Sequence, residues 1–217
     1  MSLSFELIDF LLLLREYNRD IWPLQVAALA LGLLTVFLAV SKKRYSGSII
    51  CAILAFFWLW TGAVFNLLYF RGFYPPALGF VPIFIAQGLI FAFAAFGRPG
   101  VSFHFKATPR SYAAAAMALY ALIGYPALEG LWGRGYPESL PFGLVPCPTT
   151  LFTLAVLLLA EAKIPPRLWA LPVAYALAGI VPFLNGIRED IGLIIGGVLA
   201  LYFFLRKPSG KSAECGF

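Results

Sequence analysis

The residues best suited to chemistry lie in one short stretch, Pro141 to Thr150, which reads PFGLVPCPTT. A thiol, two hydroxyls and three prolines stand there just before an apolar run. Pro148 suits the first turn of a helix, where its missing N–H has no intrahelical partner to lose. Cys147 is then expected at the N-cap, near unpaired backbone N–H groups and the positive end of the helix dipole. Two interpretations stay open for Cys147, namely a thiolate with a lowered pKa or a small buried residue in a proline-shaped turn.

Further polar side chains gather toward one end of the predicted helices, and the inner half of the protein is almost wholly apolar. Buried polar groups are costly without partners, so they usually face one another or a wet cavity. This placement predicts a polar chamber that is open to the outside and closed toward the cytoplasm by apolar packing. The predicted binding residues are Gln25, Asn66, Gln87, Tyr125, Glu129, Cys147, Thr149, Thr150 and Asp190.

Several of these residues also have a purely structural interpretation. Gln25, Asn66 and Gln87 suit hydrogen bonds between helices as well as they suit a ligand. Glu129 and Asp190 suit solvated loop charges or ion pairs as well as a binding site.

No catalytic constellation is visible in the sequence. The single histidine, His104, is remote from Cys147, and neither Gly-x-Ser-x-Gly nor His-Glu-x-x-His occurs. The three cysteines and the histidine lack metal-ligand spacing, so no metal site is expected. The sequence therefore argues against an enzyme and identifies no cofactor.

The composition is that of a membrane protein. The chain is 61% hydrophobic and 12% charged, with a mean hydropathy of +0.87, whereas soluble domains average about a quarter charged residues. The net charge of +6 is better explained by orientation in a membrane than by binding to nucleic acid.

Hydrophobic segments predict an all-α integral membrane protein, with residues 1–217 as a single transmembrane domain and a bundle of seven transmembrane helices. The segment 3–17 carries its apolar residues at helical spacing and is predicted to be an amphipathic helix at the interface. A water boundary follows, marked by Tyr17, Asn18, Arg19, Asp20 and Trp22. The predicted spans 148–162 and 191–205 are short, so they either enter from irregular backbone buried in protein, or one of them is re-entrant. A re-entrant segment would put basic loops on the wrong side of the membrane, which favours seven spans. The predicted spans are about 22–40, 48–69, 77–96, 111–131, 148–162, 168–184 and 191–205.

Basic residues predict the orientation. With seven spans, eleven of the sixteen Lys and Arg residues fall in one set of alternate loops and five in the other. The positive-inside rule then places the C-terminus in the cytoplasm and the N-terminus outside. The same topology permits a three-plus-one-plus-three arrangement of repeats, as in some transporters.

Several motifs together resemble one protein family. They are Tyr17-Asn18-x-x-x-Trp22-Pro23-x-Gln25, Trp58-x-Trp60-Thr61-Gly62 and Phe142-Gly143-x-x-Pro146-Cys147-Pro148-Thr149-Thr150. The chain resembles small bacterial polytopic membrane proteins that are grouped as a domain of unknown function. It departs from their pattern at Phe65-Asn66, where Tyr-His is typical. The resemblance implies a bacterial inner membrane location and supplies no activity.

Two functions remain open from the sequence. The first is binding or translocation of a small solute or ion through the outward-facing chamber. The alternative is a non-catalytic accessory subunit of a larger membrane complex. The expected partners are membrane lipids, other membrane subunits or a second copy of the chain, and not nucleic acid.

Overall fold

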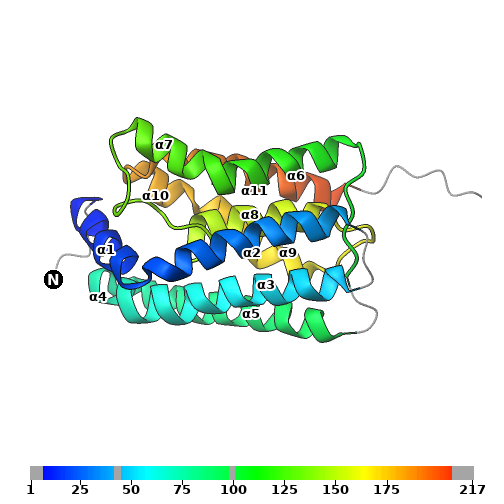
Figure 1. The fold of residues 1–217 in the computed structure, drawn as a ribbon, viewed down its shortest axis with the longest axis horizontal. Helices are drawn as coiled ribbons and strands as arrows, with labels where there is room; N and C mark the ends of the chain where they lie inside the picture. Colours follow the sequence, from blue (N-terminus) through cyan, green and yellow to red (C-terminus); the bar gives the residue numbers. More distant parts are fainter. Residues whose placement is uncertain (1–6, 42–44, 98–100, 207–217) are drawn as a thin grey trace, which may run out of the picture.

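The computed structural model describes residues 7–41, 45–97 and 101–206, and the regular elements in these ranges are helical (Figure 1). The prediction of an all-α fold is confirmed. The α-helices are α1 (Leu7–Asp20), α2 (Trp22–Val40), α3 (Ser46–Trp60), α4 (Arg71–Phe73), α5 (Phe80–Phe96), α6 (Pro109–Leu119), α7 (Tyr125–Leu131), α8 (Pro146–Leu158), α9 (Pro166–Ala178), α10 (Ile180–Leu184) and α11 (Ile191–Leu205). Stretches of π-helix, Thr61–Phe70 and Tyr120–Gly124, and 3₁₀ turns, Pro75–Gly79 and Arg188–Asp190, join some of them into longer rods.

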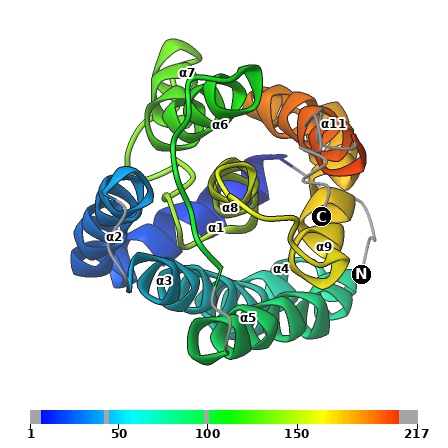
Figure 2. The same cartoon turned by 90° about the vertical axis from the view of Figure 1, so that its right-hand side faces the viewer.

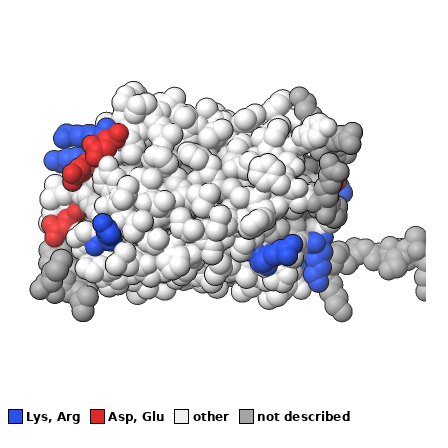
Figure 3. All heavy atoms as spheres, turned by 90° about the horizontal axis from the view of Figure 1, so that it is seen from below, with Lys and Arg blue, Asp and Glu red and all other residues white. Residues whose placement is uncertain are grey.

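Five of these rods are long and apolar enough to cross a membrane, by length and composition. They agree with the predicted segments to within four residues at each end. On the face drawn in Figure 3, charged side chains stand near the two ends, and the broad wall between them is uncharged. The five rods are Trp22–Val40, Ser46–Phe73, Pro75–Phe96, Pro109–Leu131 and Pro166–Leu184.

Helix α8 lies in the middle of a ring formed by the longer rods (Figure 2). Its sequence, PCPTTLFTLAVLL, is apolar on every side, and a helix of that kind is buried on every side. All 13 of its residues are buried, and it packs on α2, α3, α6, α9 and α11. The helix is therefore the core of the bundle.

Irregular backbone leads into and out of α8. Leu144 and Val145 are fully buried before its start, after a turn at Gly143 with φ of +75°. At the other end, the N–H of His104 donates to the carbonyl of Leu159 at 2.9 Å. The backbone that leads into this short segment is therefore irregular and buried in protein.

Helix α1 crosses one end of the bundle, which also carries α4, α7 and α10 and is called here the α1 end (Figure 1). The predicted helix over 3–17 continues to Asp20 in the structure, and its first four residues lie outside the described ranges. Of the residues expected at the water boundary, Arg19, Asp20 and Trp22 are exposed. The expectation does not hold for Tyr17 and Asn18, because both are almost completely buried. Their polar atoms bond to protein groups in place of water, as described below.

Candidate functional site

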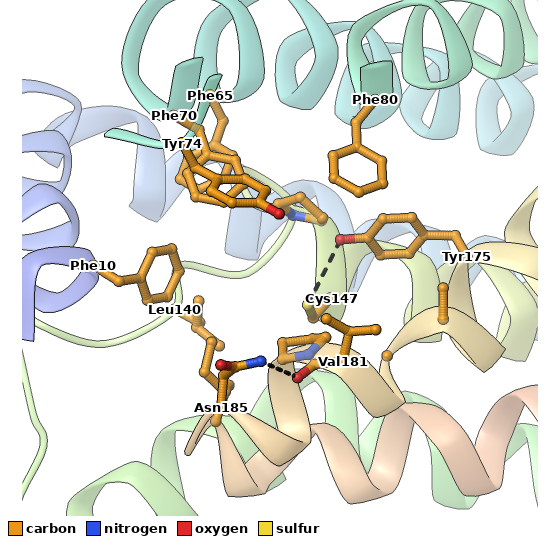
Figure 4. Close-up of a pocket in the computed structure, with 15 residues that line it drawn as sticks. Phe10, Phe65, Phe70, Tyr74, Phe80, Leu140, Cys147, Tyr175, Val181 and Asn185 are labelled. Carbon is orange, nitrogen blue, oxygen red and sulfur yellow. Dashed lines mark hydrogen bonds between the residues drawn. The ribbon is translucent and has the colours of Figure 1, made fainter. Parts of the chain in front are cut away.

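A cavity of about 470 Å³ opens at the α1 end, between α1, the rod of α3 and α4, the start of α5, and α9 with α10 (Figure 4). Aromatic rings dominate its wall, and its polar groups are hydroxyls, a thiol and the amide of Asn185. The predicted chamber was polar, whereas this cavity is mostly apolar. The rings belong to Phe10, Phe65, Phe70, Tyr74, Phe80 and Tyr175.

Cys147 contributes the thiol to the cavity wall. The helix begins at Pro146 with Val145 as its N-cap, so the expected N-cap position of Cys147 is wrong. Val145 is extended, with φ of −129° and ψ of 160°, because a residue before proline avoids the helical region. The sulfur lies 3.2 Å from Oδ2 of Asp190 and 4.0 Å from the hydroxyl oxygen of Tyr175.

Asp190 stands at the N-cap of α11 but does not cap it. Its carboxylate turns inward and accepts hydrogen bonds from the hydroxyl of Tyr125, at 2.9 Å, and from the thiol of Cys147. Asp190 has no exposed surface. Burial raises the pKa of this carboxyl to about 7, and the two hydrogen bonds oppose the rise.

Two more acids lie beside Asp190, and Arg134 neutralises one of them. The guanidinium of Arg134 contacts the carboxylate of Glu189 at 2.6 Å, and Glu189 is fully buried. Glu129 accepts the backbone N–H of Leu140 at 2.8 Å. Glu129 and Asp190 are therefore not solvated loop charges, while ion pairing does occur at Glu189.

Two motif residues of α1, Tyr17 and Asn18, hold the segment 137–144 against this helix by hydrogen bonds. The hydroxyl of Tyr17 donates to the carbonyl of Leu144 at 2.7 Å, and it accepts from the indole N–H of Trp60 at 3.0 Å. The amide of Asn18 donates to the carbonyls of Pro137 and Ser139. These bonds hold the entry to α8, and with it Cys147, at the cavity.

A family model described as a family of unknown function, DUF6064, matches residues 8–214. The chain belongs to this family. The expectation of an uncharacterised family is thereby confirmed. No curated protein and no solved structure matches the chain.

In this DUF6064 member, three predicted binding residues serve as links within the bundle. Gln25 donates to the backbone and side-chain oxygens of Asn18. The amide of Asn66 donates to the carbonyl of Thr61 within its own rod, and Gln87 on α5 donates to the carbonyl of Leu168 on α9 at 3.2 Å. None of the three lines the cavity.

Two threonines of α8, Thr149 and Thr153, stabilise the first turns of this helix. The hydroxyl of Thr149 donates to the carbonyl of Val145 at 2.6 Å. Thr153 donates to the carbonyl of Thr149 and accepts from the indole of Trp58. Thr150 is buried outside the cavity wall. Of the predicted residues, the structure thus brings together Tyr125, Cys147 and Asp190, with Glu129 behind them.

Tyr175 is a wall residue that sequence reasoning missed. It lies in the middle of apolar helix α9, and nothing in its spacing separates it from a core residue. Within the described ranges, no three side chains of the His, Cys, Asp and Glu types gather as metal ligands. The site can therefore offer aromatic faces, hydroxyls, a thiol and a buried carboxylate to a ligand.

Proposed function

We propose that the chain is a bacterial inner membrane protein that binds a small, largely apolar molecule in the cavity at its α1 end. The observation that carries this proposal is the cavity itself, whose volume of about 470 Å³ is within the usual range of ligand pockets. Such pockets combine mostly apolar walls with a few polar groups that orient the ligand. Tyr74, Cys147, Tyr175 and Asn185 supply those groups here.

Binding is favoured over translocation by the packing below the cavity. A route across the bundle would have to pass α8, whose residues are buried from Pro146 to Leu158. Helix α8 fills the middle of the ring (Figure 2). The predicted transport of a solute through a polar chamber therefore has less support than binding from one side.

The proposed topology has seven helical passes, formed by α2, α3–α4, α5, α6–α7, α8, α9–α10 and α11, with the α1 end outside. The division of basic residues between alternate loops of the sequence, eleven to five, supports it. We expect Gly130→Cys, in a chain with its native cysteines replaced by alanine, to react with a membrane-impermeant maleimide in intact cells. Lys163→Cys should react only after permeabilisation. Both positions are exposed, and a side chain at Gly130 meets no atom within 4 Å. Labelling of Lys163→Cys in intact cells would reverse the orientation.

Filling the cavity tests the binding function. Val181 lines the cavity at its rim and is 60% exposed, so Val181→Trp should fold and occupy the space. In lipid nanodiscs, neopentylbenzene should raise the unfolding temperature of the wild type, because a ligand that binds only the folded state stabilises it. We expect Val181→Trp to lose that rise.

Val198→Trp is the matched control, since Val198 is 54% exposed on α11 and does not line the cavity. It should keep the full rise. An equal rise in Val181→Trp would mean that the probe acts through the bilayer. Absence of probe binding, together with purification in a defined complex, would instead favour the accessory-subunit function.

A further inference from the structure

The aromatic rings enclose the cavity from several elements. Phe10 comes from α1, Phe70 from the rod of α3 and α4, Phe80 from α5 and Tyr175 from α9 (Figure 4). Phe80 and Tyr175 meet edge to face, with their centroids 5.9 Å apart. The face of an aromatic ring carries partial negative charge and attracts cations. A ligand in this cavity is therefore surrounded by rings and meets few hydrogen-bonding groups.

A carboxylate without a cationic partner lies directly behind this wall. Asp190 touches Cys147, and the thiol of Cys147 faces the cavity. The groups around Asp190 are the neutral Tyr120, Tyr125, Cys147 and Tyr175, the acids Glu129 and Glu189, and the cation Arg134. Arg134 is paired with Glu189, and no described Lys or Arg lies within ion-pair distance of Asp190. The negative charge of Asp190 is thus unbalanced on the side of the cavity.

We propose, on the basis of the binding function above, that the ligand of this cavity is a lipophilic organic cation of the quaternary ammonium type. The rings and the carboxylate of Asp190 together offset the loss of its hydration. A primary ammonium would need acceptors for three N–H groups, and the wall offers too few. Methylated nitrogen needs none, and its methyl groups fit an apolar wall.

Proton and cation compete for the same negative charge. Because the pKa of Asp190 is raised to about 7, a large share of the carboxyl is protonated at pH 6 and ionised at pH 8. The ionised form attracts the cation, so cation affinity should rise with pH. If only the ionised form bound it, the rise between pH 6 and 8 would be about ten-fold.

Two probes of the same shape separate charge from size. Benzyltrimethylammonium and neopentylbenzene differ only in a nitrogen cation against a carbon atom at the branch point. We expect the wild type in nanodiscs at pH 8 to bind the cation at least ten-fold more tightly than the neutral probe. Cation affinity should fall at least three-fold at pH 6, while the affinity for the neutral probe should stay constant.

Asp190→Asn tests the charge itself, because its amide oxygen still accepts from the hydroxyl of Tyr125. This variant should lose the pH dependence and most of the preference for the cation, and should bind the neutral probe as before. Phe80→Leu keeps apolar volume but removes a ring face, so it should weaken binding of the cation more than binding of the neutral probe. This variant provides the test if Asp190→Asn fails to fold. Equal affinity of the wild type for both probes would contradict the proposal that the ligand is a cation, and the proposed binding function would remain supported. If neither probe bound, both proposals would be contradicted.

Discussion

Arg134→Met should destabilise the protein by about 3–5 kcal/mol, the usual cost when one partner of a buried ion pair is removed. Arg134 is 13% exposed in its side chain, and its partner Glu189 is 0% exposed. Methionine keeps much of the aliphatic stem, so the loss reports the charge left behind on Glu189. Titration with a denaturing detergent in mixed micelles gives the free energy of unfolding.

Two variants show whether the buried charge is the cause. Adding Glu189→Gln to Arg134→Met should restore most of the stability, because an amide carries no charge to leave unpaired. Arg15→Met removes an ion pair with Glu138 that is much more exposed, so it should cost less than about 1 kcal/mol. If the double variant were as unstable as Arg134→Met, the loss would come from packing and not from charge.

Gly47→Ala should cost about 3 kcal/mol or more, at the upper end of the range for overpacking. Gly47 lies in the first turn of α3, and a Cβ atom there would overlap the carbonyl oxygen of Val101. Backbone stands on both sides of this contact, so no rotamer change can relieve it. The loss should appear as a lower midpoint in the same detergent titration.

Gly72→Ala provides the matched control. Nothing lies within 4 Å of a Cβ at Gly72, and its φ is not in the left-handed region. Alanine also lowers the conformational entropy of the unfolded chain, so this variant should be neutral or more stable by about 0.5–1 kcal/mol. Equal midpoints for the two variants would mean that α3 does not approach Val101 so closely.

Hydrophobic length was enough to predict the long helices from the sequence. Residues 22–40 were predicted as a span, and α2 has these same bounds. An uninterrupted apolar run between polar ends leaves little freedom, because its backbone must form its hydrogen bonds within the segment. Predicted segment 191–205 likewise matches α11.

Boundaries and partners that depend on tertiary packing could not be predicted. Residues 148–162 were predicted as a span, whereas α8 begins at Pro146 and ends at Leu158. Helix α8 ends where residues 159–161 pair with residues 102–104. These two segments are far apart in the sequence, so their pairing could not be predicted. The amphipathic pattern of α1 likewise gave no indication that the hydroxyl of Tyr17 forms hydrogen bonds with Leu144 and Trp60.

The site was predicted in part, and for a physical reason. Cys147 and Asp190 stood out because a thiol and a carboxylate next to apolar helices are rare. The aromatic wall did not stand out, because phenylalanines such as Phe80 are common in any membrane helix. Only the fold shows which of these rings surround an empty volume and which fill the core.

The enclosure of α8 constrains the order in which the chain can be assembled. Helix α8 touches α9 and α11, which follow it in the sequence, as well as α2, α3 and α6, which precede it. During synthesis it leaves the ribosome before two of its neighbours exist. Its threonines and short length also make it a weak segment for independent insertion. Its final placement must therefore wait until the C-terminal helix has been made, so truncation before α11 should leave the central helix without a stable place in the bilayer.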